Sequence, residues 1–151
     1  MITIHNLRNK DQTGIEMYRL IDQYAGDIDY IKVRGIPLSE FSLFEFFNFV
    51  KNIPYRQDIK GIEVVSRPEK IIDKKSVGMD CKKKSILISA YLKNRGIPFR
   101  LIASSKRPDK RIHHVFPQMK IDNEWQNMDA TYSDYKPLQI KKLTKAQVLQ
   151  R

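Results

Sequence analysis

Three side chains that together could perform nucleophilic chemistry occur in order along this sequence. Cys81 is the only cysteine among 151 residues, and the residues around it predict the first turn of a helix. His114 stands at the start of a predicted strand, and Asp129 at the end of the next. A thiol that attacks a carbonyl needs a base to take its proton and a carboxylate to orient that base. This set therefore predicts a covalent cysteine site.

The position of Cys81 predicts an activated thiol. Asp80 is a favourable N-cap residue, which puts Cys81 at the first helical position. Unpaired amides and the helix dipole favour an anion there, so we expect the thiol pKa to lie below its usual value of about 8.5. Lys82, Lys83 and Lys84 add positive charge near the sulfur, which is suited to holding an anion. The alternative for a lone cysteine is an inert, small core residue.

Strand parity selects which histidine can work with this thiol. On the predicted strand 113–121, the odd-numbered Val115, Met119 and Ile121 are apolar and should face the core. His114 then lies on the opposite face of the strand. The other two histidines, His113 and His5, are expected to be packed core residues.

A tight turn brings Asp129 to the same face as His114. Asp122 and Asn123 predict a two-residue turn between this strand and the next. That register places Asp129 opposite Phe116, one diagonal step from His114 and within reach of its side chain. A three-residue turn would reverse the parity and separate the two residues.

The other patterns describe the elements that must hold these residues. Ser42 and Glu45 form a capping box, which predicts a helix there, and the five phenylalanines of residues 41–49 are expected in the core. A helix that begins at Cys81 should end before Gly96, which can adopt a left-handed conformation. The remaining expected elements are a helix over 13–24, strands over 61–66, 98–105, 113–121 and 124–128, and a short helix after Thr144.

Composition indicates one globular domain with a basic surface. Hydrophobic residues make up 41% and charged residues 30%, which is typical of a folded chain. Lysine and arginine exceed aspartate and glutamate by 28 to 17, a net charge of +11. This charge predicts attraction to acidic partners, such as an acidic protein or peptide substrate, or nucleic acid. No recognised nucleic-acid motif stands out, so a basic nucleic-acid-binding module is an alternative that leaves the cysteine, histidine and aspartate unexplained.

The sequence also predicts the cellular location of the protein and the kinds of site that it lacks. No stretch approaches the roughly 20 apolar residues that span a bilayer, and no export signal is visible. A lone cysteine can form neither an internal disulfide nor the usual thiolate zinc site. We therefore expect a cytoplasmic protein with no membrane segment, no metal and no cofactor.

Several segments resemble the transglutaminase-like superfamily of cysteine enzymes. Asp80-Cys81 looks like its nucleophile segment, and this helix runs into Leu-Lys-Asn-Arg-Gly-Ile-Pro-Phe-Arg (92–100), which resembles the strand that follows it in the family. Residues 114–119 are similar to the histidine strand and 125–131 to the aspartate strand, while 49–55 resembles the segment before the core. Pro117 interrupts the histidine strand, which predicts an edge position or a bulge there.

The resemblance implies an α+β fold with a papain/transglutaminase-like core, in which the nucleophile helix packs on an antiparallel sheet. A single domain would cover residues 1–151. Its parts would be a helical lead-in over 1–44, a catalytic core over 45–135 and a basic tail over 136–151.

The resemblance also implies a role for each site residue. Cys81 would form a thioester with an amide or ester carbonyl, His114 would transfer protons, and Asp129 would orient the imidazole. The oxyanion hole would include the Cys81 amide, with Tyr55, Gln57 or an unassigned backbone amide as the second donor.

The leading hypothesis is a protease or amidase acting on a protein or peptide, in preference to a cross-linking enzyme. Small stand-alone proteins of this kind are familiar from bacteria and their phages, so phage structural proteins are candidate partners and a virion is a candidate location beside the cytoplasm. One alternative is a catalytically silent structural or assembly protein on the same fold, such as a phage virion component. The other is the nucleic-acid-binding module.

Overall fold

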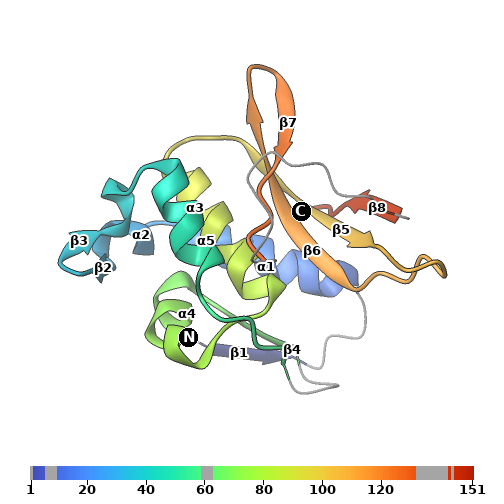
Figure 1. Cartoon of the computed structure of the whole chain (residues 1–151), viewed down its shortest axis with the longest axis horizontal. Coiled ribbons are helices and arrows are strands. Elements are labelled where there is room, and N and C mark those ends of the chain that lie inside the picture. Colours follow the sequence, from blue (N-terminus) through green and yellow to red (C-terminus); the bar gives the residue numbers. More distant parts are fainter. Residues whose placement is uncertain (1, 6–9, 59–62, 132–142, 144) are drawn as a thin grey trace.

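The computed structural model describes residues 2–5, 10–58, 63–131, 143 and 145–151 (Figure 1). Its helices are α1 (Lys10–Tyr24), α2 (Asp27–Tyr30), α3 (Leu43–Lys51), α4 (Pro68–Asp73) and α5 (Cys81–Asn94), with short 3-10 turns at Leu38–Glu40 and Lys75–Val77. Its strands are β1 (Ile2–His5), β2 (Lys32–Val33), β3 (Ile36–Pro37), β4 (Glu63–Ser66), β5 (Phe99–Ser105), β6 (His114–Ile121), β7 (Glu124–Asn127) and β8 (Lys145–Val148).

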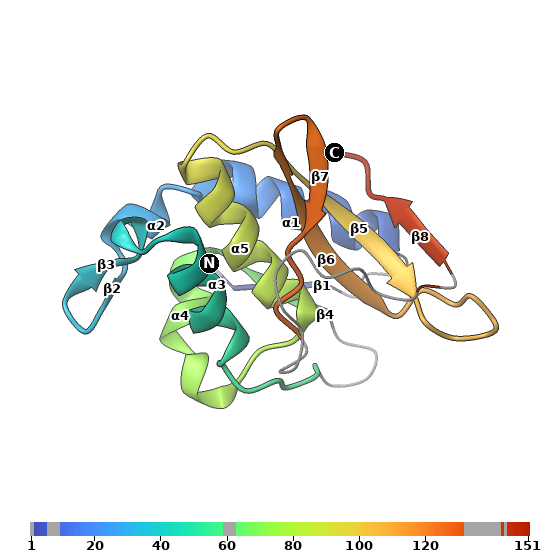
Figure 2. The same cartoon turned by 45° about the horizontal axis from the view of Figure 1, so that its top comes forward.

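Helix α5 is the centre of the fold and has the predicted bounds. Its N-cap Asp80 accepts a hydrogen bond from the Lys83 amide at 3.0 Å, and Gly96 follows its end with a φ of 71°. The helix is buried on most of its circumference and contacts α1, α3, α4, β5 and β6. Figure 2 shows it enclosed between these helices and the sheet. Because α5 is surrounded, its first turn has a fixed position relative to β6.

The main sheet is antiparallel, with the strand order β7-β6-β5-β8. Asp122 and Asn123 both have positive φ angles, 51° and 67°, as a two-residue hairpin turn with the twist of the flanking strands requires. Gln118 consequently pairs with Asn127, which is the predicted register. The α+β class, with the nucleophile helix packed on an antiparallel sheet, is confirmed.

The C-terminal strand β8 was not expected. The sequence predicts a short helix after Thr144, but Lys145–Val148 pairs with β5, so that prediction is wrong. The Leu149 amide donates to the Leu101 carbonyl at 2.9 Å, and the Tyr18 hydroxyl donates to the Leu149 carbonyl at 3.2 Å. Pairing with the open edge of β5 satisfies more backbone groups than an isolated helical turn could.

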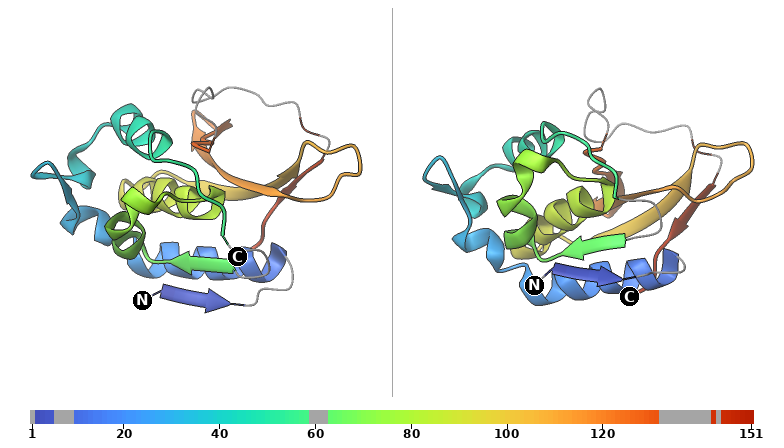
Figure 3. Two further views of the ribbon diagram at one scale, coloured as in Figure 1. Left: turned by 60° about the horizontal axis from the view of Figure 1, so that its bottom comes forward. Right: turned by 90° about the horizontal axis from the view of Figure 1, so that it is seen from below.

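The N-terminal region contributes strands as well as helices. Residues 1–44, predicted as a helical lead-in, also contain β1, β2 and β3. Strand β1 pairs antiparallel with β4, and this small ribbon runs beside α1 (Figure 3). The His5 side chain lies outside the described part of the structure.

Two burial predictions need correction. Phe46 and Phe47 are fully buried, but Phe44 is 55% exposed because it stands on the outer side of α3, so the five phenylalanines do not all belong to the core. On β6, Val115 and Met119 face the core as expected, whereas Ile121 is 38% exposed. Ile121 lies at the projecting tip of the β6–β7 hairpin, beyond the helices (Figure 1).

Pro117 is neither in an edge strand nor at a bulge, contrary to the sequence prediction. Strand β6 pairs with β5 on one side and β7 on the other, and its register with β5 is uninterrupted. The Pro117 carbonyl accepts from the Met128 amide at 2.9 Å, so its nitrogen, which has no hydrogen to donate, faces the end of β7. The missing donor therefore coincides with the place where pairing to β7 stops after Asn127.

Candidate active site

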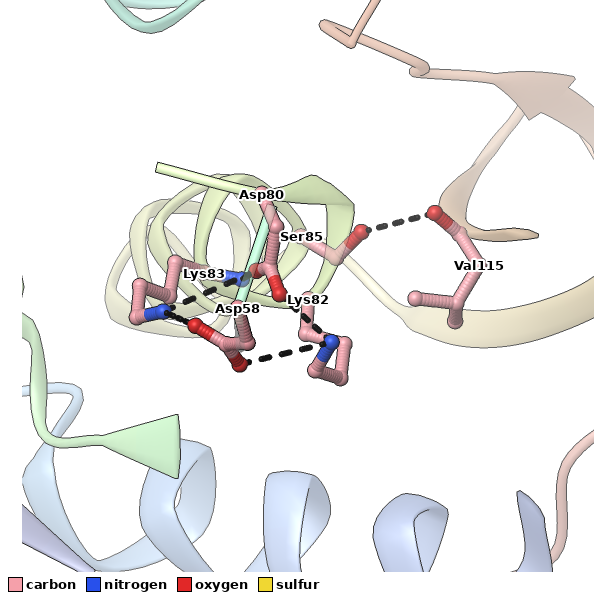
Figure 4. Close-up of polar contacts among 6 residues, drawn as sticks. All are labelled: Asp58, Asp80, Lys82, Lys83, Ser85 and Val115. Carbon is pink, nitrogen blue, oxygen red and sulfur yellow. Dashed lines mark hydrogen bonds and ion pairs between the residues drawn. The ribbon is translucent and has the colours of Figure 1, made fainter. Parts of the chain in front are cut away.

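The first turn of α5 occupies the edge of β6 where β7 ends. Because backbone groups in a strand point to alternate sides, Val115, two residues before Pro117, also presents its amide and carbonyl to the β7 side. The Val115 carbonyl accepts a hydrogen bond from the Ser85 hydroxyl at 3.2 Å (Figure 4). The Val115 amide donates a hydrogen bond to the Cys81 sulfur. The helix thus takes the place of a strand partner, and this brings the thiol to the residue next to His114.

His114 and Asp129 form a buried, hydrogen-bonded pair. The His114 Nε2 and Asp129 Oδ2 atoms are 2.6 Å apart, and the two side chains are only 5% and 0% exposed. The Thr131 amide donates to the other carboxylate oxygen at 3.0 Å. A carboxylate can only accept, so Nε2 carries the proton and Nδ1 is left as the acceptor of the ring. The predicted closeness of the two side chains is confirmed.

The environment of Cys81 differs from the sequence prediction. The residue is 7% exposed, and burial, followed by the negative charge of Asp80, raises the pKa of the thiol to about 11. Lys82 and the Val115 amide oppose this rise, and Asp129 adds to it. The expected lowering of the pKa by the helix start is therefore wrong, because loss of hydration outweighs the helix N-terminus. The resting sulfur is a neutral thiol.

The three lysines after Cys81 do not form the expected anion-holding cluster. Lys82 Nζ lies 2.5 Å from an Asp80 carboxylate oxygen and 3.7 Å from Asp58. Lys83 Nζ lies 2.6 Å from Asp58. Figure 4 shows these four side chains as one ion-pair network beside the helix start. Their positive charge is matched by carboxylates, so little of it is directed at the sulfur.

Lys84 has a different role, which the sequence did not reveal. Its side chain is buried, and its ammonium donates to the carbonyls of Ile53 at 2.7 Å, Lys51 at 3.2 Å and Ala130 at 3.3 Å. Burial lowers the pKa of this amine to about 8, and the nearby Asp129 carboxylate opposes that fall. The three donors of the ammonium are all used. Lys84 therefore ties the end of α3 to the residue that follows Asp129.

Tyr55 and Gln57, the predicted oxyanion candidates, lie on a segment that runs beside the start of α5. The Met79 amide donates to the Pro54 carbonyl at 2.9 Å, and the Arg56 amide donates to the Met79 carbonyl at 3.1 Å. Gly78 permits this approach: its φ is 98°, and a Cβ there would lie 2.8 Å from the Pro54 carbonyl oxygen. The spacing of glycine and proline in the sequence gave no sign of this pairing.

A cavity of about 630 Å³ opens beside this pair of segments. Exposed side chains of Tyr55, Gln57 and Arg107 line it together with the buried Lys84 and His114. Cys81 is not among the described residues that line it. The cavity thus reaches His114, and both oxyanion candidates line it. Its other lining residues are Lys51, Asn52, Ile53, Pro54, His113 and Thr131.

His113 belongs to this cavity and not to the core, so its prediction as a packed core residue is wrong. Strand β6 begins one residue later, and His113 therefore escapes the alternation of the strand. Its Nε2 accepts a hydrogen bond from the Lys106 amide at 3.0 Å. Burial, with the positive charge of Arg107 next, lowers the pKa of His113.

The described residues contain neither a candidate metal centre nor a membrane-spanning helix. No group of three or more histidine, cysteine or acidic side chains is placed to hold a metal ion. None of the described helices combines the length and the apolar character needed to cross a bilayer.

Comparison with known proteins assigns the family. The family model of the transglutaminase-like superfamily matches residues 39–130, which include Cys81, His114 and Asp129. The chain therefore belongs to the transglutaminase-like superfamily. No curated protein sequence matches it significantly. Among solved structures, a "putative cysteine protease" from Cytophaga hutchinsonii is similar, with 14% identity and a TM-score of 0.45 over 83% of this chain. This chain corresponds to 40% of the length of that protein.

Proposed function

We propose that the protein is a cysteine acyl-transfer enzyme, a protease or amidase, that forms a thioester at Cys81. The observation that carries the proposal is the buried contact of 2.6 Å between His114 and Asp129, on the strand whose edge receives the first turn of α5. Membership of the superfamily supports the same chemistry, while the particular reaction and the catalytic roles are our inference.

The neutral thiol defines how the proposed reaction would begin. As a substrate carbonyl enters, Nδ1 of His114 takes the Sγ proton and the sulfur attacks the carbonyl carbon. The C–N bond breaks, the imidazolium returns the proton to the leaving amine, and a thioester remains. Water then loses a proton to His114 and attacks the thioester; the acid leaves, and the sulfur regains the proton. Asp129 stabilises the imidazolium in both halves.

The negative oxygen of each tetrahedral intermediate needs hydrogen-bond donors. The Cys81 amide is one candidate, because the first amides of a helix have no partner within the helix. Gln57 and Tyr55 line the same cavity as His114. The side-chain N–H of Gln57 and the hydroxyl of Tyr55 can both donate a hydrogen bond in their neutral forms, so both are candidates for the second donor.

The experiment that tests the proposal is covalent trapping. The full chain is incubated with peptide aldehydes and peptide epoxides of varied sequence, and adducts are detected by intact mass. We expect a single adduct that is absent from Cys81→Ala. Absence of any adduct on the folded wild-type protein, across the whole set, would contradict the proposal.

Burial of the thiol favours a second candidate function. The protein would then be a catalytically silent structural or assembly protein, for example of a phage particle. Cys81 is 7% exposed and its pKa is about 11, which is also what an inert core cysteine shows. A wild-type protein that resists all carbonyl electrophiles, yet is alkylated by iodoacetamide once unfolded, would support this candidate.

A further inference from the structure

The cavity beside His114 has a one-sided charge. Lys51, Lys84 and Arg107 line it, together with two histidines, and none of the described lining residues is acidic. A hollow lined by charge of one sign concentrates the opposite charge, because its walls displace the water that would otherwise screen it. The electrostatics of this cavity therefore favour an anionic group.

Two described carboxylates, Asp129 and Asp58, are next to lining residues of the cavity, and both are engaged by other groups. Asp129 is fully buried and bonded to His114 and to the Thr131 amide. Asp58 forms an ion pair with Lys83 at 2.6 Å and lies 3.7 Å from Lys82. Both acids are engaged outside the lining of the cavity.

The three cations contribute in different ways. The ammonium of Lys84 uses its three donors on carbonyl oxygens, so it supplies charge to the wall and no contact to a ligand. Lys51, in the last turn of α3, and Arg107, exposed in the loop after β5, have the length to reach a group inside the cavity. A guanidinium can bind both oxygens of a carboxylate at once.

The loop that bears Arg107 has a defined conformation. The Arg107 amide donates to the Ser105 hydroxyl at 3.0 Å, and the Lys110 amide donates to the Arg107 carbonyl at 3.0 Å. The neighbouring Lys106 amide is bonded to the His113 ring. Because the loop is held at three points, its backbone already places Arg107 beside the cavity, and little backbone entropy is lost on binding.

We propose that this cavity binds a carboxylate of the substrate, and that the protein acts on peptides carrying a carboxylate close to the amide that Cys81 attacks. The proposal rests on the proposed function for the attack and on the cavity for the selectivity. The carboxylate has two possible sources with the same chemistry, an acidic side chain and the C-terminus of a peptide. Arg107 and Lys51 are the specificity-determining residues.

Binding to the Cys81→Ala protein tests the selectivity without requiring chemistry. Four fluorescent peptides of one sequence are compared: glutamate or glutamine at the central position, each with a free or an amidated C-terminus. We expect at least one carboxylate to tighten binding about tenfold, a difference of about 1.4 kcal/mol. Glutamate dependence identifies an acidic side chain, and dependence on the free C-terminus identifies a terminal carboxylate. Raising salt from about 0.1 M to about 1 M should remove most of the difference.

Variants in the same Cys81→Ala background locate the effect. Arg107→Gln and Lys51→Gln should each reduce the preference for the carboxylate, and Arg107→Glu should abolish or reverse it. Arg111→Gln removes the same charge from the same loop, but Arg111 does not line the cavity, so the preference should remain. Equal loss in Arg107→Gln and Arg111→Gln would show a general charge effect and overturn the proposal.

The two proposals fail separately. Equal binding of all four peptides overturns the carboxylate site, even where wild-type protein is trapped by electrophiles. A carboxylate preference that depends on Arg107, in a protein that no electrophile traps, leaves the site standing as a binding site and rejects the acyl-transfer function.

Discussion

The cavity has two walls that are built differently. His114 and Lys84, which we call the buried wall, are both less than 10% exposed and held by hydrogen bonds to two segments, the end of α3 and the residues after β7. Tyr55, Gln57 and Arg107, which we call the exposed wall, lie at the surface on two connecting segments. The difference suggests a division of labour: the buried wall carries proton transfer, which needs fixed geometry, and the exposed wall supplies the other contacts to the substrate from loops on a rigid scaffold.

Removing the imidazole of the buried wall should have the largest effect. His114→Ala leaves the neutral thiol without a base, and a positioned general base contributes about 10²- to 10⁴-fold to such a step. The rate of trapping by a peptide aldehyde should fall by that range near neutral pH. His113→Ala is the matched control, because His113 lines the same cavity but is not bonded to Asp129. Equal losses in both variants would contradict the division between the walls.

Asp129→Asn should cause a smaller loss than His114→Ala. The amide has nearly the same size, and its oxygen can still accept from Nε2 of His114, but it lacks the charge that stabilises the imidazolium. Trapping rates of Asp129→Asn and His114→Ala, measured under the same conditions, show which substitution causes the larger loss. Unchanged trapping would show that Asp129 serves only the fold, and circular dichroism is needed to confirm that the variant is folded.

Lys84→Met should lower the free energy of unfolding by about 1–3 kcal/mol, because three carbonyls lose their donor. The pH dependence of the free energy of unfolding gives a sharper test. The pKa of Lys84 falls from 10.5 to about 8, so between these values the unfolded chain binds more protons and the wild type gains stability as pH rises. The thiol acts in the opposite sense, with loss of stability from pH 9 to about 11. Urea unfolding of both proteins in a Cys81→Ala background isolates the lysine: the gain should vanish in Lys84→Met.

Gly78→Ala should destabilise the contact between the start of α5 and the segment that carries Tyr55 and Gln57. The new Cβ would lie 2.8 Å from the Pro54 carbonyl oxygen, at a φ of 98°, and strain of this kind costs about 1–3 kcal/mol. Gly26→Ala is the control, since nothing lies within 4 Å of a Cβ there and its φ is −63°. Urea unfolding should show a loss for Gly78→Ala and no loss for Gly26→Ala. A similar midpoint for both would mean that the close approach of the two segments is unimportant.

Local signals in the sequence were enough for the elements that carry the proposed triad. The Asp80 N-cap and Gly96 set the bounds of α5, and the Asp122-Asn123 turn set the register that brings Asp129 to His114. These signals act over a few residues, so they can be read without the fold.

Features that depend on distant partners could not be predicted. The rise of the Cys81 pKa comes from burial by the whole fold, and Lys84 meets carbonyls that are 31 to 46 residues away. Strand β8 forms because β5 offers an open edge, although its own sequence is compatible with a helix. The close approach at Gly78 depends on a segment that begins at Pro54. Each of these features depends on a tertiary contact that the neighbouring sequence does not reveal.

The pH dependence of trapping tests most directly the claim that His114 activates a neutral thiol. Labelling of the folded protein by a peptide aldehyde is followed by intact mass from about pH 7 to about pH 9.5 in wild type and His114→Ala. Without its base, the variant must rely on ionisation of the thiol itself, whose pKa is about 11. Its rate should therefore start far below that of the wild type and rise about tenfold per pH unit, so that the two curves converge. Equal rates in the two proteins near pH 7 would contradict the account.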